Sequence, residues 1–285
     1  MMHKVSITAS YAFFPLTESA LPSLQSELTL FGTEHDIKGL VLLAPEGINS
    51  TVCGTADAIA EWKKRMRRLK NDIHFKDSSA EQAVFRRFSV KIKPELITFK
   101  QQISTPTGKH NHLTPQAWKQ MMEREDVVLI DTRNDYETAI GTFRNAIVPG
   151  IQHFQDFPEA VRAAALPKDK TVMLYCTGGI RCEKAVLSME EQGYTSVYQL
   201  EGGILAYIEQ YPHDAFEGEC FVFDRRVAVD QQLRPSVVFT FCTKCGDPTA
   251  SAVCAGCSKQ CTPIGINSGA DGVLQALEEV QRMKA

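Results

Sequence analysis

Two cysteines and an arginine lie close together in the segment LYCTGGIRCEKA, residues 174–185. The apolar run before Cys176 predicts a strand, and the pattern from Cys182 onward predicts a helix. The residues between them form a strand-to-helix loop at the carboxyl edge of a parallel sheet, where open α/β folds bind their ligands. The two glycines of this loop allow backbone N–H groups to point inward and bind an anion. The segment therefore predicts an activated thiol at Cys176.

Each residue of this loop has a predicted role. The positive field of the helix start and the Arg181 guanidinium should lower the pKa of Cys176 and favour its thiolate, so Cys176 and Arg181 are the catalytic candidates. Cys182 is a candidate resolving thiol for an oxidised Cys176, although a thiol without a redox role fits this position equally well. The backbone N–H groups that would form the anion cradle belong to Thr177, Gly178, Gly179 and Ile180.

The segment CTGGIRC resembles the active-site loop of rhodanese domains, with Cys176 in the sulfur-accepting position. The stretch VYQLEGGILAY is similar to the downstream rhodanese signature. The stretch LIDTRNDYETAIGTFRNAIVPG is similar to the upstream one, although Thr142 stands where a histidine is common. Its charged positions hold Asp131, Arg133 and Glu137. Four residues separate Cys176 from Arg181, as in sulfurtransferases, whereas phosphatases of this fold carry one more, which argues against a phosphatase.

The order of strand and helix patterns along the chain predicts an α/β protein with four regions. Residues 1–100 follow the order β-α-β-β-α-β of a ferredoxin-like α+β module, which leaves one sheet face open for a ligand. In this module we expect Gly32 to end the first helix and Thr55 to cap the second. Residues 101–112 are polar and are broken by Pro106, as is typical of a linker. Residues 113–215 alternate strands and helices, which predicts the rhodanese domain and its parallel sheet. Residues 216–285 form a cysteine-rich extension that ends in an amphipathic helix, GVLQALEEVQRMKA.

The first region carries a local surplus of positive charge. From Trp62 to Lys100 there are twelve Lys and Arg residues against four acids, in a chain whose net charge is −3. This distribution indicates contact with a polyanion, although a solvated helix face is the simpler alternative. The RNA-binding candidates of this stretch are Lys63, Lys64, Arg67, Arg68, Arg86, Arg87, Lys91 and Lys93. Glu46 and Asn49, in the segment APEGIN, are further RNA-site candidates, although Gly47 and Asn49 also suit a tight turn.

The order of these regions resembles the rhodanese-related tRNA uridine hydroxylases. The matching segments are APEGIN (44–49), YCTGGIRCEKA (175–185), EGGI (201–204) and FVFDRR (221–226). The resemblance implies an oxidoreductase that converts the wobble uridine, position 34 of tRNA, to 5-hydroxyuridine with molecular oxygen as co-substrate. It also implies that the partner is the anticodon loop of tRNA, whose unstacked bases a protein can reach without melting a duplex.

Two mechanisms and two rival functions stay open. A Cys176 thiolate can add to the electrophilic C6 of uracil and raise the electron density at C5, or Cys176 can first become a persulfide that activates oxygen. The strongest rival is a sulfurtransferase that passes sulfane sulfur from Cys176 to a thiol or to a tRNA-thiolation acceptor. The other is a scaffold that binds RNA or protein without catalysis, against which the intact Cys-to-Arg loop argues.

The C-terminal cysteines have the spacing of a metal site. Cys242-x-x-Cys245 and Cys254-x-x-Cys257 form two knuckles, as in four-cysteine structural zinc sites, although the gap between them is short. Free or redox-active thiols are the alternative, and Cys261 offers a fifth thiol. The chain contains no flavin or nicotinamide fingerprint of the G-x-G-x-x-G type.

Other features predict an intracellular protein, and the remaining cysteines and histidines carry no predicted function. No apolar run reaches the roughly 20 residues that span a bilayer, and the N-terminus does not resemble a signal peptide, so we expect a cytoplasmic protein. We expect Cys53 and Cys220 to be packed in the core. We assign no role to His110 or His112, because histidines in a linker are usually solvated.

Overall fold

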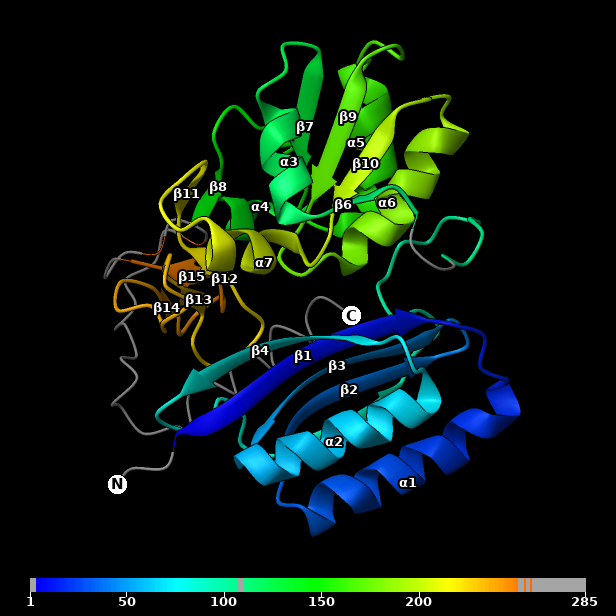
Figure 1. The fold of residues 1–285 in the computed structure, drawn as a ribbon, viewed down its shortest axis with the longest axis vertical. Helices are drawn as coiled ribbons and strands as arrows, with labels where there is room; N and C mark the ends of the chain where they lie inside the picture. The colour runs from blue at the N-terminus through cyan, green and yellow to red at the C-terminus, as the bar shows by residue number, and fades with distance from the viewer. Residues whose placement is uncertain (1–3, 107–109, 251–253, 255–256, 258–285) are drawn as a thin grey trace.

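Two sheets, one above the other in Figure 1, make up most of the chain. The computed structural model describes residues 4–106, 110–250, 254 and 257. A five-stranded sheet with two helices forms the N-terminal module, and a four-stranded sheet flanked by helices forms the central domain. None of the helices in these described ranges is long and apolar enough to cross a membrane.

The N-terminal module has the predicted ferredoxin-like topology. Its sheet has the order β4-β1-β3-β2-β5, in which β1 pairs antiparallel with β3 and β4, and β2 pairs antiparallel with β3 and parallel with β5. Helices α1 and α2 cover one face, and the opposite face is turned toward the central domain (Figure 1). The elements are β1 (Val5–Phe13), η1 (Glu18–Ala20), α1 (Leu21–Glu34), β2 (Lys38–Ala44), β3 (Gly47–Gly54), α2 (Ala56–Leu69), β4 (His74–Ala80) and β5 (Phe88–Ile92).

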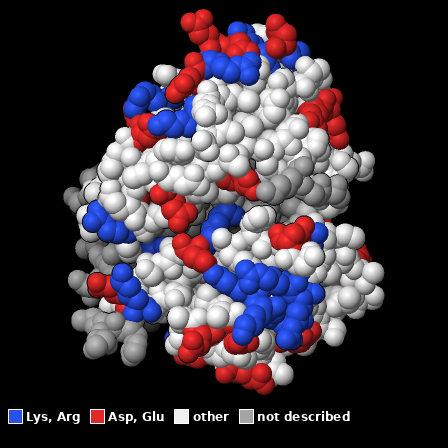
Figure 2. All heavy atoms as spheres, viewed as in Figure 1, with Lys and Arg blue, Asp and Glu red and all other residues white. Residues whose placement is uncertain are grey.

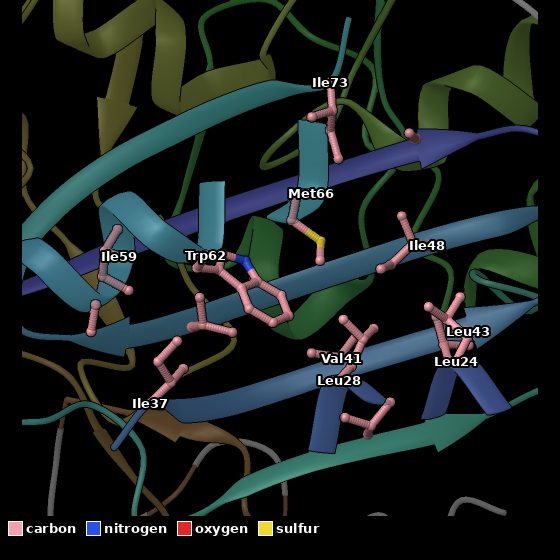
Figure 3. Packing of buried hydrophobic residues seen from close by; sticks show 14 of the residues in the cluster. Leu24, Leu28, Ile37, Val41, Leu43, Ile48, Ile59, Trp62, Met66 and Ile73 are labelled. Atoms are coloured by element: carbon pink, nitrogen blue, oxygen red, sulfur yellow. The ribbon is translucent and has the colours of Figure 1, made fainter. Parts of the chain in front are cut away.

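The core of this module lies between the sheet and its two helices. Trp62 and Met66 of α2 and Leu28 of α1 are fully buried against Val41 and Ile48 of the sheet (Figure 3). The apolar stripe that predicted α2 is the face that packs here, which places its charged residues on the outside. The backbone N–H of Ala58 donates to Thr55 Oγ1 over 3.2 Å, which confirms the predicted cap.

The prediction that α1 ends at Gly32 is wrong, because the helix continues to Glu34. A Cβ atom at Gly32 would lie 2.3 Å from the ring of Phe88 on β5. The glycine therefore permits close packing of the helix on the fifth strand, and it does not act as a stop signal.

The central domain has the predicted parallel sheet, in the order β6-β10-β9-β7. Alternate residues of β9 serve two cores: Val172 and Leu174 pack with α5 and α6, whereas Met173 and Tyr175 pack with α3 and α7. The sheet therefore carries helices on both faces. The elements are β6 (His112–Leu113), α3 (Pro115–Met122), β7 (Val127–Asp131), α4 (Asp135–Thr138), β8 (Gly141–Phe143), η2 (Phe154–Asp156), α5 (Phe157–Ala164), β9 (Thr171–Tyr175), α6 (Ile180–Glu191), β10 (Val197–Leu200) and α7 (Gly203–Gln210).

The strands that follow α7 form short antiparallel pairs, one of them with β8 of the central domain. Strand β11 pairs with β8, β12 with β13, and β14 with β15, all antiparallel. The bounds are β11 (Phe216–Gly218), β12 (Cys220–Phe221), β13 (Ala228–Val229), β14 (Thr240–Phe241) and β15 (Pro248–Thr249). The predicted helix GVLQALEEVQRMKA and Cys261 lie outside the described residues.

Candidate active site

The Cys176 side chain lies at the N-terminus of α6, where the loop after β9 brings it. The thiol is fully buried, and the backbone N–H of Gly179 donates to its Sγ over 3.0 Å. The N–H of Arg181 donates to the same sulfur. Gly179 has a φ of +99°, a conformation that glycine adopts readily and that turns its N–H inward. The predicted anion cradle is thus occupied by the sulfur of Cys176 itself.

The loop favours a thiolate at Cys176 over one at Cys182. Burial alone would raise the pKa of Cys176, but the Cys182 thiol, the Arg181 guanidinium and the N–H groups of Arg181 and Gly179 outweigh it and lower that pKa. Burial and the neighbouring charge of Cys176 raise the pKa of Cys182 well above its ordinary value. The pair therefore holds one proton on Cys182, which donates to Cys176 Sγ.

A carboxylate holds Arg181 in place beneath the loop. The two guanidinium nitrogens of Arg181 donate to the two oxygens of Glu137, over 2.5 and 2.8 Å. Both side chains are buried, and Glu137 also accepts from the backbone N–H of Asn134, the N-cap of α4. Glu137 therefore links Arg181 to the start of α4 and orients the charge that favours the Cys176 thiolate.

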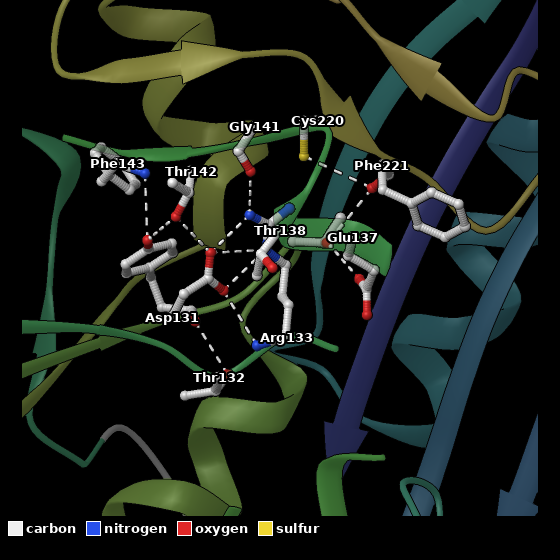
Figure 4. A network of polar contacts seen from close by, with 12 residues as sticks. Asp131, Thr132, Arg133, Glu137, Thr138, Gly141, Thr142, Phe143, Cys220 and Phe221 are labelled. Atoms are coloured by element: carbon white, nitrogen blue, oxygen red, sulfur yellow. Dashed lines mark hydrogen bonds and ion pairs between the residues drawn. The ribbon is translucent and has the colours of Figure 1, made fainter. Parts of the chain in front are cut away.

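The other charged positions of the upstream signature form a structural network. Asp131 and Arg133 are paired over 2.7 Å with no exposed surface, and Thr142 donates to Asp131 over 2.9 Å (Figure 4). Thr142 also shares a 2.7 Å hydrogen bond with the hydroxyl of Tyr175, the residue before Cys176. Thr142 thus connects β8 to the end of β9, and this network supports the strand that leads into the Cys176 loop.

The downstream Gly-Gly signature packs directly on the Cys176 loop. The N–H groups of Ile204 and Leu205 donate to the carbonyl oxygens of Cys176 and Thr177, over 3.0 and 3.2 Å. A Cβ atom at Gly203 would lie 2.5 Å from the oxygen of Cys176, and Gly203 has a φ of +68°. Only glycine fits here, so the start of α7 fixes the loop from the side opposite α6.

The open face of the N-terminal sheet covers this site. Tyr11 of β1 donates to Glu183 Oε1 over 2.9 Å, and Glu183 lies on α6 just after Cys182. His112 Nε2 lies 3.1 Å from the same oxygen, and its side chain is only 10% exposed. The expectation that His112 is solvated is therefore wrong, because β6, the edge strand of the central sheet, places this side chain against Glu183 of α6. His110 is more exposed and pairs with Glu190 over 2.8 Å.

Lys76 of β4 also reaches this site. Lys76, Tyr11 and Glu183 are the residues near the site that the sequence did not indicate. The Cδ and Cε of Lys76 lie 3.8 Å from the position that a Cβ would occupy on Gly178. The signal that could have found it is the alternation of β4, in which Phe75 faces the helices and Lys76 the opposite side.

The RNA-binding candidates lie on the N-terminal module, away from the Cys176 loop. Lys63, Lys64, Arg67 and Arg68 belong to α2, on the far face of the sheet, and Figure 2 shows a patch of Lys and Arg over this helix. Arg86 and Arg87 precede β5, Lys91 lies on it and Lys93 directly follows it, at the edge of the sheet.

Glu46 and Asn49 have different surroundings. The Glu46 carboxylate accepts from the backbone N–H of Leu96 over 2.6 Å and pairs with Lys184 of α6 over 2.9 Å. Asn49 lies opposite Tyr11 in the β1–β3 register. Glu46 thus joins the two domains, whereas Asn49 lies beside a residue that covers the site.

The four knuckle cysteines come together at β14 and β15. Their sulfur atoms all lie within 4.8 Å of one another, with Cys242 and Cys257 3.8 Å apart and Cys245 and Cys254 3.5 Å apart. Cys53 and Cys220 are buried, as expected, and burial raises the pKa of Cys220 to about 12.

Two protein-family models match the chain. The UPF0176 acylphosphatase like domain matches residues 5–96, and the rhodanese-like domain matches residues 114–210. Among solved structures, a rhodanese-like domain protein from Staphylococcus aureus is 28% identical with a TM-score of 0.30, covering 34% of this chain and 91% of that one.

Curated relatives match over most of their length and of this chain. A tRNA uridine(34) hydroxylase of Bdellovibrio bacteriovorus is 45% identical over 257 residues, which cover 88% of this chain and 73% of that protein. A tRNA uridine(34) hydroxylase of Prochlorococcus marinus strain MIT 9303 is 39% identical over 85% of this chain and 81% of its own. With this identity, and with an acylphosphatase-like module ahead of a rhodanese domain, the chain belongs to the tRNA uridine(34) hydroxylase family.

Proposed function

We propose that this protein hydroxylates C5 of the wobble uridine of tRNA, forming 5-hydroxyuridine with molecular oxygen as co-substrate. The observation that carries the proposal is the Cys176 sulfur, held as a thiolate at the start of α6 and covered by a second module in a chain of this family. A rhodanese that serves small sulfur donors needs no such cover. We place this reaction in the cytoplasm, where tRNA is available.

The thiolate acts on the base. Cys176 adds to C6 of uracil and shifts electron density to C5, which then attacks oxygen. The Arg181 guanidinium and the N–H groups of the cradle, from Thr177 to Arg181, stabilise the sulfur anion before addition and after release. The rival persulfide mechanism predicts an added sulfur atom on the active enzyme, which the intact mass of the freshly purified protein would reveal.

Cys182 supplies the second thiol for the electron balance. Attack of C5 on oxygen gives a hydroperoxide, and loss of the C5 proton then expels the Cys176 thiolate from C6. This thiolate attacks the outer peroxide oxygen and breaks the O–O bond, which leaves 5-hydroxyuridine and a sulfenic acid on Cys176, and Cys182 displaces the sulfenic hydroxyl as water to form the disulfide. In sum, oxygen, uridine and two thiols give 5-hydroxyuridine, one water and one disulfide. The protonated Cys182 thiol, in contact with Cys176, is placed to form this disulfide. A small thiol or a dithiol protein then reduces the pair for the next turnover.

Different regions have different roles. Residues 1–100 bind RNA, 113–215 carry the chemistry, 101–112 link them and 216–285 add the cysteine cluster. The lysines and arginines of α2 and of the β5 edge bind tRNA phosphates outside the anticodon loop, because they lie away from Cys176. Asn49, beside Tyr11, contacts the anticodon loop, and Glu46 lies next to this contact.

The cysteine cluster binds a structural zinc ion. Four sulfurs about 2.3 Å from one ion lie about 3.8 Å apart in a tetrahedron. Two of the separations are 3.8 and 3.5 Å and all four sulfurs lie within 4.8 Å of one another, which fits a set of four thiolates, Cys242, Cys245, Cys254 and Cys257. Elemental analysis beside thiol titration should find one zinc and four blocked thiols per chain; four freely titrating thiols would contradict it.

The function is tested by mass spectrometry of tRNA nucleosides. Cells without the gene should lose the 5-hydroxyuridine made by this route, and the wild-type gene should restore it while Cys176→Ser should not. Purified protein with unmodified tRNA, oxygen and a thiol should form the nucleoside. If the purified protein forms none, but transfers sulfur from thiosulfate to an acceptor, the sulfurtransferase alternative replaces the hydroxylase.

A further inference from the structure

Lys76 points from the N-terminal module toward the Cys176 loop. Side chains alternate along β4, so that Phe75 packs beneath Arg67 of α2 whereas Lys76 and Ser78 lie on the opposite face, toward Gly178 and Arg226. Ser78 accepts a 3.0 Å hydrogen bond from Arg226, which follows the central domain. The face that carries Lys76 is therefore the one that meets the rest of the chain.

The stem of Lys76 lies on two glycines of the active site. Its Cδ and Cε are each 3.8 Å from the Cβ position of Gly178, and its Cε is 3.9 Å from that of Gly202. Its Nζ lies 4.7 Å from the centre of the Tyr11 ring. Gly178 belongs to the Cys176 loop and Gly202 caps α7, so the stem of Lys76 lies at van der Waals range from the backbone of both active-site segments.

A cavity of about 600 Å³ adjoins the lysine. Its walls include Tyr11 and Lys76 from one module and Glu183, Gly202 and Leu205 from the other. Cavities of 300–1,000 Å³ are typical of sites that enclose small ligands, so a flipped-out pyrimidine nucleotide fits the size. Lys76 lines this cavity, and its stem lies beside Gly178 of the Cys176 loop.

The surroundings of Lys76 combine burial with negative charge. Burial lowers the pKa of Lys76 to about 8, while the charges of Cys176, Glu183 and Glu201 oppose that shift. Tyr11 faces it as well, and His112, Glu209 and Arg226 line the same cavity. At neutral pH most of the Lys76 side chain is an ammonium ion, and it lies at the wall of the cavity.

We propose that Lys76 is a catalytic residue, supplied by the N-terminal module, that binds O4 of the target uracil and stabilises the enolate formed when Cys176 adds to C6. The inference rests on the proposed function. In this step the thiolate electron pair forms the S–C6 bond, the C5–C6 π pair moves toward C4, and the C4 carbonyl pair moves onto O4. No oxidant is consumed, and the negative charge passes from sulfur to an oxygen beside the ammonium ion.

The test compares three variants with the wild-type protein on unmodified tRNA. Lys76→Met keeps the stem but removes the charge, and Lys76→Arg keeps a charge that does not titrate near neutrality. Lys168→Met is the matched control, because Lys168 also lies over a tyrosine ring, that of Tyr194, but on the surface of the central domain. The measurements are kcat, KM and the dissociation constant of tRNA across the neutral and alkaline pH range.

We expect Lys76→Met to lose roughly 100-fold in kcat, as when one oxyanion donor is removed, with little change in tRNA affinity. The wild-type rate should fall as pH rises through about 8, where Lys76 loses its proton. The residual rate of Lys76→Met should not fall at alkaline pH. Lys76→Arg should be more active than Lys76→Met, and its rate should not fall at alkaline pH either. Lys168→Met should match the wild type.

Three outcomes would overturn the role of Lys76: a kcat of Lys76→Met above half of wild type, a loss confined to tRNA affinity, or an unchanged alkaline fall in that variant. The wild-type protein separates this inference from the proposed function. If it forms no 5-hydroxyuridine, the function itself fails; if it does and Lys76→Met does too, only the role of Lys76 fails.

Discussion

Cys176, Cys182 and Cys220 are all fully buried, yet their surroundings give them different chemistry. Burial disfavours the charged form of any thiol. For Cys220 burial prevails and raises the pKa to about 12, whereas at Cys176 the N–H groups and Arg181 reverse its effect. The difference comes from orientation: the loop before α6 directs several donors at the Cys176 sulfur, whereas Cys220 gains none that outweighs its burial.

A spectroscopic titration tests this contrast. Because the pKa of Cys176 is lowered, its thiolate should persist as the pH falls from alkaline to neutral values. The ultraviolet thiolate absorbance of the wild type at neutral pH should therefore exceed that of Cys176→Ser by one thiolate. Cys220→Ser should match the wild type under the same conditions. Equal absorbance of wild type and Cys176→Ser would show that Cys176 is protonated.

At the scale of elements, the local patterns were sufficient to predict the strand-to-helix loop that carries Cys176. Cys176, Arg181 and the glycines are adjacent in sequence, and the strand-to-helix pattern places them at a sheet edge. His112, Lys76 and Glu183 could not be found this way, because their proximity arises from contacts between residues at least 71 positions apart. The Gly32 prediction failed for the same reason, since the partner that needs a glycine is Phe88.

Two glycines next to α6 and α7 provide a prediction about the loop. Both Gly203 and Gly193 have positive φ angles, but a Cβ at Gly193 has nothing within 4 Å, whereas one at Gly203 meets the oxygen of Cys176. Gly193→Ala should cost only the backbone strain of about 1 kcal/mol. Gly203→Ala should cost about 1–3 kcal/mol more, as in overpacked cores, and should lower the hydroxylation rate.

Urea unfolding and the rate of nucleoside formation measure both effects. The comparison removes the contribution of the positive φ angle, which the two sites share. Equal destabilisation by the two substitutions, with activity retained in Gly203→Ala, would show that α7 does not hold the Cys176 loop in place.

At the scale of the molecule, the N-terminal module is fastened over the site by polar contacts. Lys184 of α6 pairs with Glu46 over 2.9 Å and Glu95 over 2.7 Å, and its side chain is 3% exposed. Tyr11 and Glu183 add a second link. The same sheet face that was predicted to carry a ligand is therefore held against the loop, which explains how two modules of separate topology form one site.

The pairing of Lys184 makes the interface sensitive to acid. Burial disfavours the charge on Glu95, but Lys184 and the backbone N–H groups of Lys100 and Phe99 outweigh it and lower the pKa of this carboxyl. The ion pair therefore stabilises the folded protein fully above the unfolded-state pKa of about 4.3, and this contribution is lost as the pH falls through the lower folded-state pKa.

Comparing Lys184→Met with Lys119→Met should show how much more stability the buried interface pair contributes than a surface ion pair does. Removing the ammonium leaves two carboxylates facing each other without a cation, which should cost about 3 kcal/mol of unfolding free energy. Lys119→Met, which removes a partly exposed pair with Asp214, should cost at most about 1 kcal/mol. Urea unfolding at neutral pH measures both, and hydroxylation should fall only in Lys184→Met, because the cover over Cys176 loosens while the loop remains intact. If both variants unfold and react alike, the N-terminal module is held by its apolar contacts and the ion pair is incidental to the site.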